Sequence, residues 1–232
     1  MFKTIQVVPN VTKQMHKSTF FILFLFTWTF ALSETIDYYI TNRKYRIAYD
    51  LIKSEVDSLR SEGQITESRA ELLIAGSYCA AQLGIWDTSY NFSKEVLPIA
   101  DSLENHSLKG IAQMNMGVSL KSWGRFDDAV NIYKKALISL QKAEDTLNMI
   151  CLYSNMGIVY KEWARYDEAR SWYLKVLSKK EQMADTAGII TVLNNLAGVH
   201  FQTGDTTRAR ELLDRAITYA RAINHRYFEA YL

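Results

Sequence analysis

Side chains that could catalyse a reaction or hold a metal are few and scattered in this sequence. The four histidines are His16, His106, His200 and His225, too dispersed to form a ligand cluster. Glycine-rich phosphate loops and the motifs G-x-S-x-G, H-E-x-x-H and C-x-x-C are absent from the sequence. We therefore expect no catalytic residue, no metal and no cofactor, and we interpret His200 as a hydrogen-bonded histidine of the core.

The remaining reactive side chains have structural explanations. Carboxylate pairs occur at residues 127–128 and 167–168, where each begins an expected helix and favours the positive end of the helix dipole. The two cysteines, Cys79 and Cys151, fall at different positions of units that are not adjacent, too far apart for a disulfide. We expect both to be packed thiols.

Three asparagines, Asn115, Asn155 and Asn195, recur at a step of 40 residues without insertion or deletion. The same step joins Gly84, Gly124, Ala164 and Gly204, and also Ala129, Ala169 and Ala209. A fixed period of this size indicates a repeat array, in which each unit buries its apolar face by stacking on its neighbours. Such an array favours binding over catalysis.

Two amphipathic helices are expected in each unit. In one of these units, for example, apolar residues recur at three- and four-residue spacing over 147–163 and again over 166–183. Asp145 and Asp185 precede first helices and are suited to cap them. Only two prolines occur in 232 residues, which agrees with a mostly helical protein.

The pattern N-[ML]-[GA]-x-x-[YLH]-x-x-x-[GA]-x-[FYT]-x-x-A occupies residues 115–129, 155–169 and 195–209. It resembles the tetratricopeptide repeat, with about six residues added to the usual unit, as in the repeats of kinesin light chain and of mitotic-spindle orientation adaptors. The resemblance implies an all-α fold, a right-handed α-solenoid of antiparallel helix pairs. The sequence also resembles the extracytoplasmic tetratricopeptide-repeat arrays of bacterial signalling proteins.

Four segments are expected along the chain. Residues 1–33 form a signal peptide or an uncleaved anchor, and residues 34–64 hold a lone N-terminal capping helix. Residues 65–225 form four repeat units, of which the first is degenerate: Ser89 replaces the repeat alanine, and Pro98 should kink or shorten the second helix. Residues 226–232 begin a further helix, which we interpret as truncated.

The N-terminal segment has the layout of a secretory signal peptide. Lys13, His16 and Lys17 precede an apolar stretch at residues 19–32, which is shorter than the roughly 20 residues that span a bilayer. We expect export to the periplasm or cell envelope, with a membrane anchor at residues 19–32 as the alternative. Contact with a membrane is expected only here or through a missing C-terminal region.

The formal net charge of +2 excludes a strongly basic, nucleic-acid-binding composition. Lys3, Lys13 and Lys17 all lie in the first 33 residues, which contain no acidic residue. The slight excess of basic residues therefore comes from the N-terminal segment, and no nucleic-acid partner is expected.

The resemblance implies that the first helices line a concave face that binds a protein or peptide. Carrying the family's groove positions onto this sequence gives an apolar and polar set: Tyr78, Met114, Val118, Lys121, Ile158, Lys161, Asn194 and Phe201. In the longer repeats, asparagines such as Asn115, Asn155 and Asn195 bind the backbone of an extended peptide. The alternative is that each asparagine hydrogen-bonds within its own repeat.

Three functions remain open from the sequence. The first is an exported interaction module that forms the sensory or regulatory part of a signalling protein. The alternative is a structural scaffold or assembly factor of the cell envelope that self-associates, for example as a homodimer through the C-terminal helix. A cytosolic adaptor is the third possibility if residues 1–33 are not a signal peptide.

Overall fold

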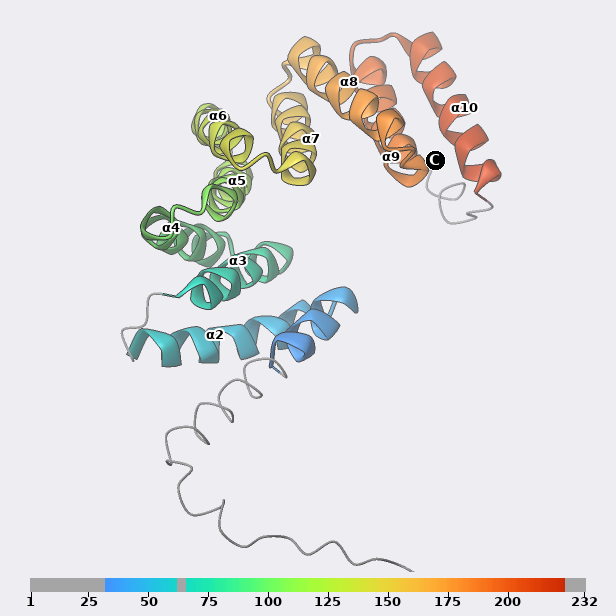
Figure 1. Cartoon of the computed structure of the whole chain (residues 1–232). Coiled ribbons are helices and arrows are strands. Elements are labelled where there is room, and N and C mark those ends of the chain that lie inside the picture. Colours follow the sequence, from blue (N-terminus) through green and yellow to red (C-terminus); the bar gives the residue numbers. More distant parts are fainter. Residues whose placement is uncertain (1–31, 62–65, 224–232) are drawn as a thin grey trace, which may run out of the picture.

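The computed structural model describes residues 32–61 and 66–223, which consist of helices joined by short turns (Figure 1). After α2 (Tyr45–Ser61), the helices alternate between first and second members of antiparallel pairs. The first helices are α3 (Glu67–Gln82), α5 (His106–Ser122), α7 (Thr146–Glu162) and α9 (Thr186–Gln202). The second helices are α4 (Trp86–Ser102), α6 (Phe126–Lys142), α8 (Tyr166–Gln182) and α10 (Thr206–Ala222).

The helix boundaries repeat the 40-residue step of the sequence. From α7 onward, each first helix begins 40 residues after the previous one, and from α6 onward so does each second helix. Each helix packs on the helix that follows it, which produces one continuous stack. The predicted all-α solenoid of antiparallel helix pairs is confirmed.

Side-chain caps start the first helices, as predicted. The carboxylates of Asp145 and Asp185 accept hydrogen bonds from the backbone N–H groups of Asn148 and Gly188. Thr66 does the same for α3. In contrast, α4, α6 and α8 have no side-chain cap and instead place acidic residues in their first turn.

The turns inside each repeat require a left-handed residue. Gly84, Gly124 and Gly204 have φ angles of 72°, 73° and 82°, whereas the equivalent turn holds Ala164 at 59°. Glycine adopts this conformation without the steric penalty that a Cβ brings. The period of glycines in the sequence therefore has a backbone cause, with one exception at Ala164.

Glycines inside α5 and α7 admit tyrosines from the paired second helices. A Cβ at Gly117 would lie 2.1 Å from Cε1 of Tyr133, and a Cβ at Gly157 would lie 2.5 Å from Cε1 of Tyr173. Both tyrosine side chains are completely buried. The conformational cost of glycine within a helix, about 1 kcal/mol relative to alanine, is thus offset by this close packing.

The N-terminal end differs from two expectations. The helix α4 has 17 residues despite Pro98, so the proline does not shorten it. Proline removes one backbone hydrogen bond, but burial of Val96, Ile99 and Ala100 keeps the following turn in place. The capping helix α2 is also not alone, because residues 32–41 before it are helical.

An ion-pair cluster joins α2 to the next two helices. Arg60 of α2 and Arg69 of α3 both pair with Glu95 of α4, and the distance from Arg60 Nη2 to Glu95 Oε2 is 2.5 Å. Burial alone would raise the pKa of Glu95, but these two guanidinium groups outweigh it and lower the pKa. The segments predicted at residues 226–232 and, except for its last two residues, at 1–33 lie outside the described residues.

Candidate binding face

The first helices form the inner side of the curved array. Figure 1 shows α3, α5 and α7 toward the inside of the arc, with α4 and α6 on its outer side. The first helices also contact each other directly, α3 with α5 and α5 with α7. We call the solvent-facing surface of α3, α5, α7 and α9 the inner face.

Most of the predicted groove residues offer surface on these helices. Tyr78 is 41% exposed and Phe201 is 65% exposed. The side chains of intermediate burial are Val118, Lys121, Ile158, Lys161, Asn194 and the three asparagines of the repeat. Met114 is the exception: it is 8% exposed because it packs into the core that joins the central repeats, so it offers little surface to a ligand.

The three repeated asparagines do not share one environment. Asn115 donates a hydrogen bond from Nδ2 to Oγ of Ser77 on α3, at 2.7 Å. One repeat later, the position of Ser77 is Gly117, and in the next repeat it is Gly157. Asn155 and Asn195 make no side-chain hydrogen bond to any residue that the structure describes. Asn115 therefore bonds to the preceding repeat and does not make the bond within its own repeat that was the predicted alternative.

Two buried tyrosines belong to this region and were missed by the sequence reasoning. The hydroxyls of Tyr133 and Tyr173 are buried and have no hydrogen-bond partner within residues 32–61 and 66–223. Burial, and then the negative charge of Glu162, raise the pKa of both tyrosines. The sequence signal for these tyrosines was their 40-residue step, which matches the step from Gly117 to Gly157.

One ion pair crosses the inner face. Lys121 Nζ of α5 lies 3.0 Å from Glu162 Oε1 of α7. The lysine one repeat later is Lys161, and the residue equivalent to Glu162 on α9 is Gln202. Lys161 makes no ion pair with any described residue. The two lysines share a repeat position but differ in their electrostatic partners.

Sequence comparison identifies the repeat. The profile of the tetratricopeptide repeat matches residues 124–182 and 148–222. Residues 124–222 of this chain therefore belong to tetratricopeptide repeats. The same helix-pair geometry continues upstream of the match through α3, α4 and α5. No curated protein matches the chain in sequence.

Solved tetratricopeptide-repeat-like structures share the fold. BtubC from P. vanneervenii superposes with a TM-score of 0.69 at 20% identity, covering 84% of this chain and 80% of BtubC. The Rap conjugation gene regulator of plasmid pLS20, in complex with the Phr* peptide, superposes with a TM-score of 0.72 at 18% identity. That match covers 99% of this chain and 62% of the Rap chain. At these identities the likeness establishes the fold.

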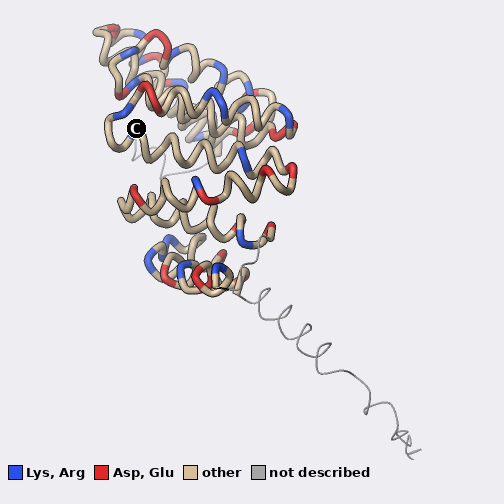
Figure 2. The backbone as a smooth tube through the Cα atoms, turned by 90° about the vertical axis from the view of Figure 1, so that its left-hand side faces the viewer, with Lys and Arg blue, Asp and Glu red and all other residues tan. Residues whose placement is uncertain are grey.

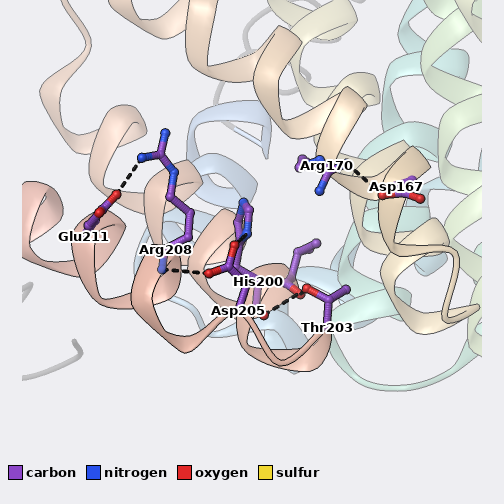
Figure 3. A network of polar contacts seen from close by, with 8 residues as sticks. Asp167, Arg170, His200, Thr203, Asp205, Arg208 and Glu211 are labelled. Carbon is purple, nitrogen blue, oxygen red and sulfur yellow. Dashed lines mark hydrogen bonds and ion pairs between the residues drawn. The ribbon is translucent and has the colours of Figure 1, made fainter.

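The C-terminal tetratricopeptide repeat holds a polar network at its turn (Figure 3). Asp205 caps α10 by accepting the N–H of Arg208 at 3.0 Å, and His200 Nδ1 lies 3.1 Å from the same carboxylate. The hydrogen bond from the Arg208 backbone is the main cause that lowers the pKa of Asp205. The expected hydrogen-bonded role of His200 is thus what the structure shows, at a half-buried position.

Other reactive groups of the repeats do not converge on a site. Cys79 is buried, and burial raises its pKa to about 11. Cys151 is exposed on α7, so the prediction of a packed thiol was wrong there. Residues 32–61 and 66–223 contain no group of three His, Cys, Asp or Glu side chains able to hold a metal ion. None of the helices described has the length and hydropathy needed to cross a bilayer.

Proposed function

We propose that this chain is a protein-interaction module that binds an extended peptide, or an extended segment of a protein, on its inner face. The observation that carries the proposal is the set of unpartnered polar groups beside accessible apolar side chains. Asn155 and Asn195 lack partners among the described residues, while Ile158 and Phe201 are accessible on the same helices. An amide side chain can donate to and accept from a peptide unit at the same time.

The structural comparison supports this choice of ligand. One Rap structure was solved with the Phr* peptide and another with the Competence and Sporulation Factor. Repeat solenoids present extended concave surfaces to their partners. The sequence similarity is too low to carry over a particular peptide, so the ligand must be found experimentally.

The test is selection of peptides from a displayed library of random dodecapeptides on the full chain. Asn155→Ala combined with Ile158→Glu should abolish binding of the selected peptides, because the first removes an amide and the second places a charge on an apolar contact. The matched control is Leu174→Glu on α8, where the leucine is 50% exposed on a second helix. Binding that survives the double substitution in a folded protein would contradict the inner-face assignment.

We also propose that the module is exported and serves as the sensory or regulatory part of a signalling protein. The support is the arrangement of a basic flank and the apolar residues 19–32 ahead of the repeats. An alkaline phosphatase fusion after residue 64 should be active in the periplasm, and the mature mass should show whether cleavage follows Ser33. A fusion that is active only without residues 1–33, or a wholly cytosolic native protein, would contradict export.

The scaffold alternative makes a different prediction about assembly. A scaffold acting by self-association should form dimers or larger species at micromolar concentration. Sedimentation of the purified chain with and without a selected peptide separates the two functions. A monomer that binds peptide supports the interaction module, whereas stable self-association without peptide binding supports the scaffold.

A further inference from the structure

Charged side chains are sparse on the inner helices of the C-terminal repeats. The helix α9 contains no Asp, Glu, Lys or Arg, and α7 contains only Lys161 and Glu162. The second helices α6, α8 and α10 carry many acidic and basic residues. Figure 2 marks the charged residues along the backbone. One charge on α7 therefore lacks a counter-ion among the residues that the structure describes.

Lys161 is that unpaired charge. Glu162 is already bound to Lys121 at 3.0 Å, and the repeat places Gln202 where Lys161 would otherwise find an acidic partner. Lys161 is half-buried on α7. A carboxylate brought by a ligand would supply the counter-ion that the chain provides for Lys121 but not for Lys161.

The neighbours of Lys161 suit the rest of a peptide. Ile158 lies one helical turn before it on the accessible side of α7, and Asn155 lies one further turn back. On α9, Phe201 is 65% exposed and precedes Gln202. Beneath this region, the buried hydroxyl of Tyr173 has no partner in the described part of the chain. Along α7, an amide, an apolar side chain and a cation thus follow one another at three-residue spacing, and Phe201 adds an exposed apolar side chain on α9.

We propose that the peptide bound on the inner face carries an acidic side chain whose carboxylate pairs with Lys161, beside apolar side chains that contact Ile158 and Phe201. This inference rests on the proposed peptide-binding function and specifies the ligand's chemistry and its place on α7 and α9. The α3 and α5 part of the inner face plays a smaller role, because Asn115 and Lys121 already have partners.

The experiment uses the peptides selected on the full chain and, for each one, a version with Asp or Glu replaced by Asn or Gln. We expect the selected sequences to be enriched in one acidic position. Lys161→Gln should raise the Kd of the acidic peptide about tenfold, as expected for loss of a charge-assisted hydrogen bond. Gln202→Glu should have a similar effect, because the new carboxylate would pair with Lys161 as Glu162 pairs with Lys121.

Two controls separate the possible outcomes. Lys134→Gln removes an exposed lysine from α6 and should leave every Kd unchanged. The amide versions of the peptides should bind weakly and be insensitive to both Lys161→Gln and Gln202→Glu. Circular dichroism of each variant verifies that the repeats remain folded.

The results distinguish this inference from the function on which it rests. If Asn155→Ala with Ile158→Glu abolishes binding while Lys161→Gln and the amide peptides change nothing, the peptide site stands and the acidic preference is wrong. If an acidic preference depends on Lys134, the site is on the outer face and the inference is overturned. If no peptide is enriched, both the inference and the proposed function fail.

Discussion

The inner face contains two junctions of first helices, α3 with α5 and α7 with α9, whose equivalent repeat positions carry different side chains. Between α3 and α5, Asn115 binds Ser77 at 2.7 Å. Between α7 and α9, the equivalent amide is Asn195, and the position of Ser77 is occupied by Gly157. The first junction satisfies its own polar groups, whereas the second leaves the amide without a partner among the described residues.

The comparison shows how two parts of a repeat array can offer different polar groups to solvent while keeping the same helix pairs. A serine becomes a glycine, which removes a hydrogen-bond partner and makes room for Tyr173 from the second helix. A glutamate becomes Gln202, which leaves Lys161 unpaired. Each change alters the surface offered to a ligand, while the helix lengths and the 40-residue step remain the same.

The largest expected effect on stability comes from filling the space between Gly157 of α7 and the ring of Tyr173. Gly157→Ala should destabilise the protein by about 1–3 kcal/mol, because the new Cβ would overlap the ring of Tyr173. Gly198→Ala is the matched control on α9, where no heavy atom lies within 4 Å of the added Cβ. It should stabilise the protein by about 0.5–1 kcal/mol, since alanine favours a helix over glycine. Urea denaturation measures both, and equal effects would contradict the packing account.

The next prediction contrasts the polar groups of the two junctions. Ser77→Ala should cost about 1 kcal/mol of unfolding free energy, because it leaves Asn115 without its partner. Tyr173→Phe should leave stability unchanged or raise it, because the hydroxyl that it removes is buried and unpartnered. The same denaturation experiment measures both. A loss of stability in Tyr173→Phe equal to that in Ser77→Ala would show that the hydroxyl has a partner in solution, such as a bound water.

The turns within the repeats of the two junctions also hold different residues at their left-handed position. The α3–α4 turn uses Gly84 at a φ of 72°, whereas the α7–α8 turn holds Ala164 at 59°. Ala164→Gly should therefore stabilise the protein by about 0.5–1 kcal/mol, after the entropy cost of glycine is subtracted from the relieved left-handed strain. Thermal unfolding measures the change, with Gly84→Ala as the reverse substitution that should lower the Tm. A lower Tm for Ala164→Gly would contradict the strain assigned to this turn.

The smallest effect concerns pH. The hydrogen bond from Lys180 and then that from the Gly188 backbone lower the pKa of Asp185, the cap of α9, whereas Thr66 caps α3 without titrating. A lowered folded pKa gives stability that is present above the unfolded value of about 3.9 and is lost as the pH falls through the folded value. The Tm of the wild type should therefore fall relative to Asp185→Ser between pH 6 and pH 3. A constant Tm difference would exclude the cap as a source of acid sensitivity.

Much of the fold could be predicted because each repeat carries the same local signals, so several copies indicate the same helix pair. The caps at Asp145 and Asp185 and the step of the helices followed from local sequence preferences. The candidate site was less predictable. Met114 was placed on the inner face but lies in the core, and Cys151 was placed in the core but is exposed. Residues one helical position apart differ by about 100° in direction, so repeat position alone does not fix burial near the edge of a face.

The sequence alone determined the period, the helix pairs and the positions that need glycine, because these depend on local backbone preferences and on apolar spacing. Only the tertiary structure decided which polar groups have partners. The bonds from Asn115 to Ser77 and from Lys121 to Glu162 join residues 38 and 41 positions apart. They also depend on how neighbouring repeats are stacked. The side chains that meet where repeats stack, and not the repeated motif alone, decide which polar groups of the inner face have partners.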